Sequence, residues 1–275
     1  MLIRTSNNEY SALPDTTSKG TQEKWVVGNR FYKLDPISGY DSLAEALVSE
    51  LESHIVDLDF VDYFIDVPKT VEGERRRVCY SENCVPSGYT EVTLHKVLLS
   101  VYPDLKVLNK CVGKDFLERC IEVVKSQLGY NPVKYFAKVI YLDSITLNED
   151  RHLNNISFLI NKDGIATYMP ILDNGRALLS DLSKYPLERS ILSCIRRVKS
   201  KPFSTSFKKQ VSYVADLYPP LVIDYESFKE VIETAKENLD TFTFKDVVAT
   251  KVLRRMILVL LQNLKEQEGL TWVRK

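Results

Sequence analysis

The chain has 275 residues, which is enough to bury a substantial core in one two-lobed domain or in two small ones. Basic and acidic residues balance at 37 each, so the formal net charge is zero. Because no overall field attracts nucleic acid or an anionic membrane, we expect no direct nucleic-acid partner and no membrane partner.

The first residues lack the long apolar core of a signal peptide, and no uninterrupted apolar run reaches membrane-spanning length. We therefore expect a cytoplasmic location. The cysteines are odd in number and form no CxxC pair, which favours reduced, mostly buried thiols over a disulfide or a zinc site. They are Cys79, Cys84, Cys111, Cys120 and Cys194.

A polar, turn-rich stretch opens the chain and predicts a loop up to Gly20. After it, Lys24 to Val27 and Asn29 to Leu34 predict two short strands joined at Gly28-Asn29, a dipeptide suited to a tight hairpin. The hydroxyl-rich residues 16–20 precede the first strand, where backbone N–H groups of a turn can bind phosphates. A single Gly is not a G-x-G-x-x-G pattern, so the local sequence favours an ordinary surface loop.

Lys33 lies on the second of these strands. The apolar residues that follow recur at helical spacing, and Asp41 or Ser42 can cap that helix. We expect Glu45 to pair with Lys33, because it lies in the first two turns beside the apolar stripe; Glu50 is the alternative. Taken alone, a strand lysine before an acidic helix is more typical of a solvated surface pair.

Phe60 to Val67 and Arg76 to Cys79 predict two further strands, with a charged turn at residues 72–75 between them. Residues 77–83 are expected to cross between the two halves of the domain. From Pro86 onward apolar residues recur every three to four positions, which predicts helices. These helices span Glu91 to Val101, Lys114 to Leu128, Pro132 to Leu147, Phe207 to Leu217, Tyr225 to Leu239 and Phe244 to Gln267.

A basic stretch lies in the last third of the chain. It is most simply a solvated segment, with contact to a phosphate or an acidic partner as the alternative. Its residues are Arg196, Arg197, Lys199, Lys201, Lys208 and Lys209.

The strongest signal is a set of oxygen ligands between Leu147 and Ala177. Asp150 and Asn155 share one short loop, and Asp173 follows two strand-like runs that are joined by the turn at residues 161–164. A protein kinase needs an Asp that receives the substrate hydroxyl proton, an Asn for Mg²⁺ five positions on, and an Asp-containing tripeptide for Mg²⁺ after a hairpin. The order and spacing here match that set.

Several motifs resemble those of the HipA-like kinases. The architecture looks closest to the CtkA-like proteins, which lack the additional N-terminal subdomain of HipA. The matching stretches are Gly20-Thr21-Gln22-Glu23-Lys24, Lys33, Asn148-x-Asp150-x-His152-x-x-Asn155 and Ile171-Leu172-Asp173-Asn174-Gly175, with Asn174 where Phe stands in the usual tripeptide.

The resemblance implies an α+β, two-lobed protein-kinase-like fold, which phosphatidylinositol kinases share. A small β-rich N-lobe would cover residues 1–84, and a larger, mainly helical C-lobe residues 85–275. It also implies an atypical bacterial Ser/Thr protein kinase that uses ATP and Mg²⁺, phosphorylates a protein partner and phosphorylates itself. A hydroxyl of Thr16, Thr17 or Ser18 would receive the autophosphorylation, and the sequence does not decide which. The nucleotide would bind Ser18, Gly20, Thr21 and Gln22 together with Lys33.

The expected roles follow kinase chemistry. Asp150 orients the substrate hydroxyl and accepts its proton, while Asn155 and Asp173 hold the metal ions. Lys33, held by Glu45, pairs with the α/β-phosphates of ATP.

His152 is expected to brace the catalytic loop by hydrogen bonding rather than to transfer a proton. Two other functional classes remain open: a nucleotide-binding pseudokinase that acts as an interaction module, and a small-molecule or lipid kinase, since the same ligands serve any hydroxyl acceptor. No motif in the sequence identifies the acceptor protein, a cognate antitoxin or the oligomeric state.

Overall fold

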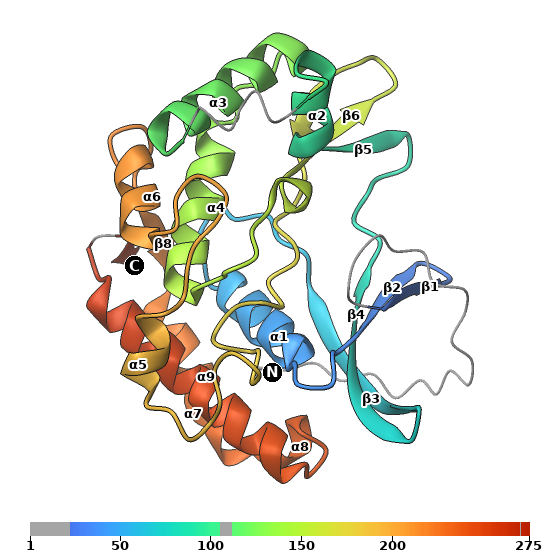
Figure 1. Cartoon of the computed structure of the whole chain (residues 1–275), viewed down its shortest axis with the longest axis vertical. Coiled ribbons are helices and arrows are strands. Elements are labelled where there is room, and N and C mark those ends of the chain that lie inside the picture. The colour runs from blue at the N-terminus through green and yellow to red at the C-terminus, as the bar shows by residue number, and fades with distance from the viewer. Residues whose placement is uncertain (1–22, 105–111, 270) are drawn as a thin grey trace.

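The computed structural model describes residues 23–104, 112–269 and 271–275. A small antiparallel sheet stands on one side of the molecule, most helices on the other, and helix α1 (Asp41–Glu52) lies between them (Figure 1). The expected mixed α and β character is therefore confirmed. Among the described residues, no helix is both long and apolar enough to cross a membrane.

The sheet contains β1 (Lys24–Val27), β2 (Arg30–Leu34), β3 (Tyr63–Val71) and β4 (Glu74–Glu82), in the order β1-β2-β4-β3. The predicted hairpin forms at Gly28, whose φ of +59° is one that glycine adopts without strain. β4 is longer than predicted because β2 and β3 pair with its two edges. Residues 77–82 are therefore part of the sheet, and the crossing to the helices begins only at Asn83.

Helix α1 is buried at every position except Glu50. The expected cap is wrong: Asp41 and Ser42 lie inside the first turn, and the N-cap residue, Tyr40, makes no side-chain cap. Asp35 caps the helix from outside, because its carboxylate accepts hydrogen bonds from the Ser42 backbone N–H and hydroxyl, each at 2.7 Å. The turn after β2 brings this carboxylate back over the start of the helix.

A second sheet joins β5 (Tyr89–Thr93), β6 (Ser157–Asn161) and β7 (Ala166–Tyr168). The helix expected from Glu91 begins only at Leu94 as α2 (Leu94–Val101), because the preceding residues pair with β6. Thr93 caps it by accepting a hydrogen bond from the Lys96 backbone N–H at 3.3 Å. A short parallel pair, β8 (Leu221–Ile223) and β9 (Trp272–Arg274), was not predicted.

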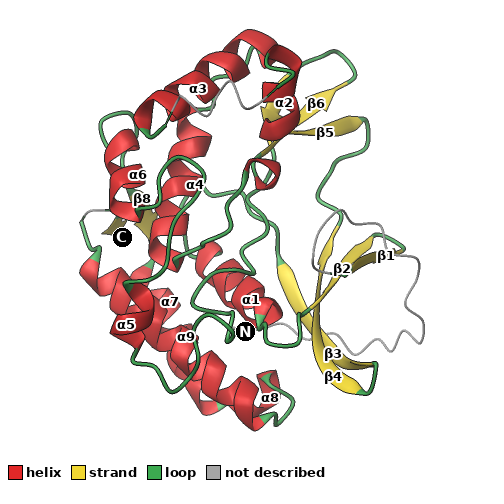
Figure 2. Ribbon diagram, in the orientation of Figure 1, coloured by secondary structure: helices red, strands yellow, loops and turns green. Residues whose placement is uncertain are grey.

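Each of the remaining helices contributes buried residues to the main hydrophobic core, and most of them lie on the side of the molecule away from the first sheet (Figure 2). Helix α3 (Lys114–Leu128) has the predicted bounds, and α4 (Val133–Thr146) differs from its prediction by one residue at each end. The last helix, α9 (Val247–Glu266), starts later than expected because Phe244 and Lys245 have positive φ and Asp246 caps it. The others are α5 (Ile191–Ile195), α6 (Phe207–Val214), α7 (Tyr225–Glu237) and α8 (Leu239–Phe242).

Four cysteines have free thiols, as predicted, and Cys79, Cys120 and Cys194 are buried while Cys84 is half-buried. The fifth, Cys111, lies outside the described residues.

We predict that Asp35→Ala lowers the free energy of unfolding by about 1–3 kcal/mol at pH 7, because two buried donors on Ser42 lose their acceptor. Burial raises the pKa of Asp35 to about 6, whereas its pKa in an unfolded chain is about 3.9. Between these values the folded protein binds a proton that the unfolded chain does not, so this carboxyl stabilises the fold further as the pH falls. The penalty of the substitution should therefore be larger at pH 5 than at pH 7.

Urea unfolding of the two proteins at both pH values measures this difference. Asp163→Ala, which removes an exposed carboxylate from a turn, is the control and should change the free energy of unfolding by less than about 0.5 kcal/mol. A penalty that shrinks on acidification would contradict the prediction.

Candidate active site

The candidate residues lie where helix α1, the first sheet and two loops meet. One loop follows α4, whose end is the left-handed residue Leu147 (φ +56°), and it carries Asp150 and Asn155. The other follows β7 and carries Asp173. Segments far apart in the sequence thus converge on one region of the molecule.

Lys33 stands at the centre of this region. Its Nζ lies 2.6 Å from Glu45 Oε1, 2.8 Å from Asp173 Oδ1 and 3.0 Å from the Tyr63 hydroxyl oxygen. The structure therefore brings together the three residues that the sequence analysis placed around the phosphates. Glu50, the alternative partner, lies 3.5 Å from the imidazole of His54.

The charges of this cluster reinforce one another. Burial alone would lower the pKa of Lys33, but the carboxylates of Asp173 and Glu45 outweigh it and hold the pKa well above its usual value. Burial alone would raise the pKa of Asp173, yet the charges of Lys33 and Lys24 hold it well below its usual value. Burial raises the pKa of Glu45, and Lys33 offsets only part of that effect. Lys33 and Asp173 therefore remain a cation and an anion at neutral pH.

The tripeptide Asp173-Asn174-Gly175 fits tightly against helix α1. Asp173 has a left-handed φ of +64°, a conformation that Asp tolerates better than most residues. The Asn174 backbone N–H donates to Glu45 Oε2 at 2.7 Å, and its side chain donates to Glu52 Oε1 at 3.3 Å. A Cβ on Gly175 would come within 3.0 Å of a side chain on α1. Helix α1 therefore favours a polar side chain at position 174 and leaves little room for a side chain at position 175.

Arg151 braces the predicted catalytic loop, a role that we expected of His152. The guanidinium is fully buried and pairs with Asp143 on α4, with Nη2 2.9 Å from Oδ1 and Nε 3.1 Å from Oδ2. It also donates to the Asn174 side-chain oxygen at 2.5 Å and to the Leu172 carbonyl oxygen. The buried Nδ1 of His152 has no hydrogen-bond partner among the described residues. The expected side-chain hydrogen bonding of His152 is therefore absent among the described residues, because the carboxylate of Asp143 and the loop after β7 meet Arg151 instead.

Asn148 connects the two loops. Its side-chain oxygen accepts from the Asp150 backbone N–H at 3.1 Å, and its side-chain nitrogen lies 3.4 Å from the Asp173 carbonyl oxygen. Asn155 donates from its side-chain nitrogen to the Asp150 carbonyl oxygen at 3.4 Å. This orients Asn155 and leaves its amide oxygen as an acceptor.

The donor set suits Mg²⁺ that is shared with a substrate. Asn155 offers an amide oxygen and Asp173 an ionised carboxylate, and Mg²⁺ is usually held by one or two such ligands together with phosphate oxygens and water. Within the described ranges, no three His, Cys, Asp or Glu side chains gather into a metal site made of protein alone. The assignment of Asn155 and Asp173 as metal ligands remains a prediction.

Asp150 is the most open member of the set, with 42% of its side chain exposed. Its Oδ1 lies 2.7 Å from Lys201 Nζ, which comes from the basic stretch. The remaining predicted nucleotide ligands lie outside the described residues, so their role stays a prediction. They are Ser18, Gly20, Thr21 and Gln22, together with the hydroxyls of Thr16 and Thr17.

Sequence reasoning did not single out several residues of the site. Lys24 belongs to a motif that we quoted, and its Nζ lies 3.9 Å from Asp173 Oδ2. Arg151 directly follows the predicted catalytic Asp, and this adjacency could have marked it as a residue of the site. Lys201 was named only as part of the basic stretch, and Tyr63 had no signal, because only the fold brings them to the site.

A comparison with models of known protein families finds no match, and neither does a comparison with curated protein sequences. Among solved structures, the chain is similar to the proinflammatory kinase CtkA of Helicobacter pylori, with a TM-score of 0.57 and 13% identity over 92% of this chain and 98% of that one. HipA in the Shewanella oneidensis complex of HipA, HipB and operator DNA gives a TM-score of 0.48 and 11% identity over 94% of this chain and 66% of that one. The chain thus has a CtkA-like architecture, and at this identity the likeness concerns the fold alone.

We predict that Arg151→Leu lowers the free energy of unfolding by about 3–5 kcal/mol, because Asp143 would be left as a buried charge without a partner. Asp143→Leu should cost a similar amount. The double variant should cost clearly less than the sum of the two, since it leaves neither charge behind. Chemical denaturation of the four proteins completes the cycle, and additive losses would show that the pair is not coupled.

Proposed function

We propose that this chain is a Ser/Thr protein kinase of the HipA/CtkA-like type that uses ATP and Mg²⁺. The observation that carries the proposal is the position of Lys33, which touches Glu45 on α1 and Asp173 on the loop after β7 at the same time. A kinase requires the ion pair between a strand lysine and a helix glutamate, with a metal-binding aspartate at the same site. The CtkA-like fold supports the proposal independently of these residues.

In this proposal the first sheet and α1 form the N-lobe over residues 1–84, and residues 85–275 form the C-lobe. ATP would lie between them, with its phosphates directed at Lys33. The ion pair with Glu45 fixes this ammonium before the nucleotide arrives, so little reorganisation is needed on binding. The loop before β1, with Ser18, Gly20, Thr21 and Gln22, would cover the phosphates.

Bound Mg²⁺ would neutralise the phosphate charge, and Asn155 and Asp173 would hold it. The Lys33 ammonium binds the α/β-phosphates and screens their repulsion. Asp150 accepts the proton of the attacking Ser or Thr hydroxyl and keeps that oxygen pointed at the transferable phosphoryl group. Positioning supplies most of the acceleration, since the protein performs little covalent chemistry.

Lys201 occupies one carboxylate oxygen of Asp150, the predicted proton acceptor. Its ammonium already contacts the carboxylate, so the acceptor hydroxyl has to share or replace that contact. Both side chains are partly exposed, which makes the exchange inexpensive. In this proposal the same ammonium would also attract the negative charge of a phosphoryl group transferred beside Asp150.

We predict that Asp150→Ala lowers phosphoryl transfer by about 10²–10⁴-fold, to below detection in a self-labelling assay, and leaves the fold intact. The measurement is incorporation of labelled phosphate from ATP without added substrate, together with circular dichroism. Labelling of the wild-type protein on Ser or Thr would favour a protein kinase over a small-molecule or lipid kinase, and a protein that labels nothing and turns over no ATP would be a pseudokinase. The control Asp163→Ala should label normally, and undiminished labelling of Asp150→Ala would refute the assigned role.

We predict that Asp173→Ala weakens nucleotide binding about tenfold or more in the presence of Mg²⁺, because a charged ligand of the metal is lost. In EDTA the same substitution should have a smaller effect. Titration of a fluorescent ATP analogue with Mg²⁺ and with EDTA measures both affinities. Equal losses in the two conditions would show that Asp173 does not act through the metal.

A further inference from the structure

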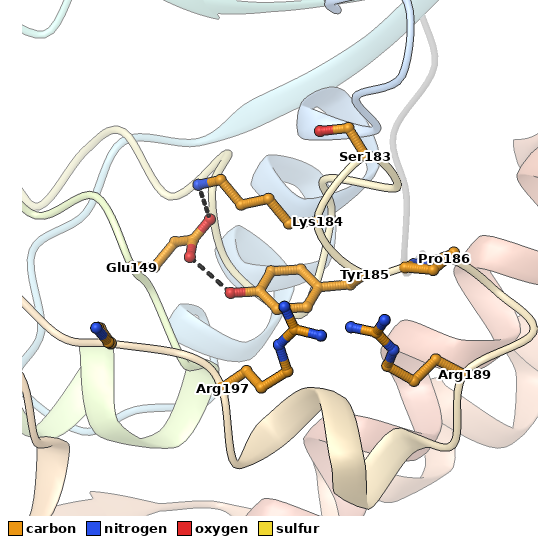
Figure 3. A pocket seen from close by; sticks show the side chains of 8 residues that line it. Glu149, Ser183, Lys184, Tyr185, Pro186, Arg189 and Arg197 are labelled. Carbon is orange, nitrogen blue, oxygen red and sulfur yellow. Dashed lines mark hydrogen bonds and ion pairs between the residues drawn. The ribbon is translucent and has the colours of Figure 1, made fainter.

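A cavity of about 460 Å³ adjoins the predicted catalytic loop. Its wall includes Glu149, the residue before Asp150. The rest of the wall comes from two later segments, within residues 183–189 and 197–199. Figure 3 shows the side chains of Arg189 and Arg197 reaching toward one another beside the ring of Tyr185. A volume of this size falls within the range of ligand sites in proteins, about 300–1,000 Å³.

The one carboxylate in the wall is already neutralised. Glu149 lies 2.7 Å from Lys184 Nζ and accepts a hydrogen bond from the Tyr185 hydroxyl, also at 2.7 Å (Figure 3). Burial and this carboxylate raise the pKa of Tyr185, so the hydroxyl keeps its proton and donates. The negative charge of Glu149 is therefore satisfied from within the wall.

Three cations of the wall are not satisfied in this way. Across residues 23–104, 112–269 and 271–275, no ion pair engages Arg189, Arg197 or Lys199. Arg197 and Lys199 are exposed and Arg189 is half-buried, so water screens part of the repulsion among these like charges, and a bound anion would reduce it further. Guanidinium groups bind phosphate and carboxylate in a bidentate way, so the cavity suits an oxyanion.

The wall is anchored in the core rather than carried on a free loop. Arg255 of α9 is buried and donates to the Tyr185 carbonyl oxygen at 2.7 Å and to the Leu179 carbonyl oxygen at 2.8 Å. Tyr185 itself is buried. The backbone of the wall at Tyr185 is therefore held by the same core that packs against the predicted catalytic loop.

The cavity is close to the place where the acceptor hydroxyl would sit. Glu149 directly precedes Asp150, and Lys199 lies two residues before Lys201, whose Nζ is 2.7 Å from Asp150. Two residues of chain span at most about 7 Å. Three residues of an extended peptide span at most about 10 Å, so an acceptor whose hydroxyl meets Asp150 can direct a side chain of a neighbouring residue toward this wall.

We propose that this cavity binds an anionic side chain, phosphorylated or carboxylic, of the polypeptide acceptor within three residues of the accepting Ser or Thr. The inference rests on the proposed function and names its substrate class: hydroxyls next to phosphate or acidic groups. It also gives the basic stretch a role that the zero net charge of the chain conceals. Arg189 and Arg197 contribute most, because both side chains reach into the cavity (Figure 3).

The test uses fluorescein-labelled peptides with one Ser and a single variable position between three residues before and three residues after it. That position holds phosphoserine, Glu, Ala or Lys. Fluorescence anisotropy measures binding to the full chain without nucleotide, and labelled ATP measures transfer. At one fixed offset, the phosphoserine and Glu peptides should bind roughly 10- to 100-fold tighter than the Ala peptide, and the Lys peptide should bind more weakly than it. The comparison of phosphoserine with Glu decides which oxyanion the cavity prefers.

The double variant Arg189→Ala/Arg197→Ala should reduce that preference to less than about threefold. Arg196→Ala is the matched control, because Arg196 is exposed and adjacent to Arg197 but does not line the cavity. It should retain the full preference. Circular dichroism establishes that both variants are folded.

Two results would overturn the inference. The first is equal binding of the anionic and Ala peptides to the wild-type protein; the second is a preference that survives in the double variant. Neither depends on catalysis. If the preference is present and lost in the double variant while the wild-type protein transfers no phosphate to itself or to any peptide, the anion site stands and the kinase proposal fails.

Discussion

The buried ammonium of Lys33 is the constraint on which the rest of the site depends. A buried charge is tolerated only when it is paired and hydrogen-bonded. Its partners come from β3, α1 and the loop after β7, through Tyr63, Glu45 and Asp173. None of these segments can move away without leaving a charge or a polar group unpaired in the interior. The lysine therefore fixes the geometry before any ligand binds, which is the condition for electrostatic preorganisation.

A second buried cation, Arg151, does the same for the other half of the site. It joins α4 to the predicted catalytic loop, and Asn174 links it to the lysine cluster. The backbone of Asn174 bonds Glu45, and its side chain bonds both Glu52 and Arg151. An apolar ring at this position would remove the side-chain donor to Glu52 and one acceptor of Arg151 in the interior, which accounts for Asn where Phe stands in the usual tripeptide. The two loops are thereby held as one unit.

Asp150 lies between a buried polar network on one side and a solvent-exposed region on the other. Behind it lies a dense network of buried polar groups, centred on Asn148 and Arg151. In front of it, Lys201 and the cationic cavity are open to solvent. The rigid side suits the positioning of a reacting group, and the open side suits the exchange of acceptors. A formal net charge of zero hides this separation, because it sums charges without regard to where the fold places them.

Local patterns in the sequence were enough for helix α3 at Lys114–Leu128 and for strand β1, because period and spacing are properties of neighbouring residues. Local patterns were not enough where contact with a segment distant in the sequence determines the local structure. Glu91 joins a strand because β6 pairs with it, and the cap of α1 comes from Asp35 because the chain folds back over the helix. The choice of Arg151 over His152 depends on Asp143 and on the loop after β7, and the cationic cavity depends on three segments that only the fold brings together. The sequence thus determined which chemical groups are present and how far apart they lie along the chain. The tertiary structure decided which of them meet, because pairing and burial of charge depend on distances in space.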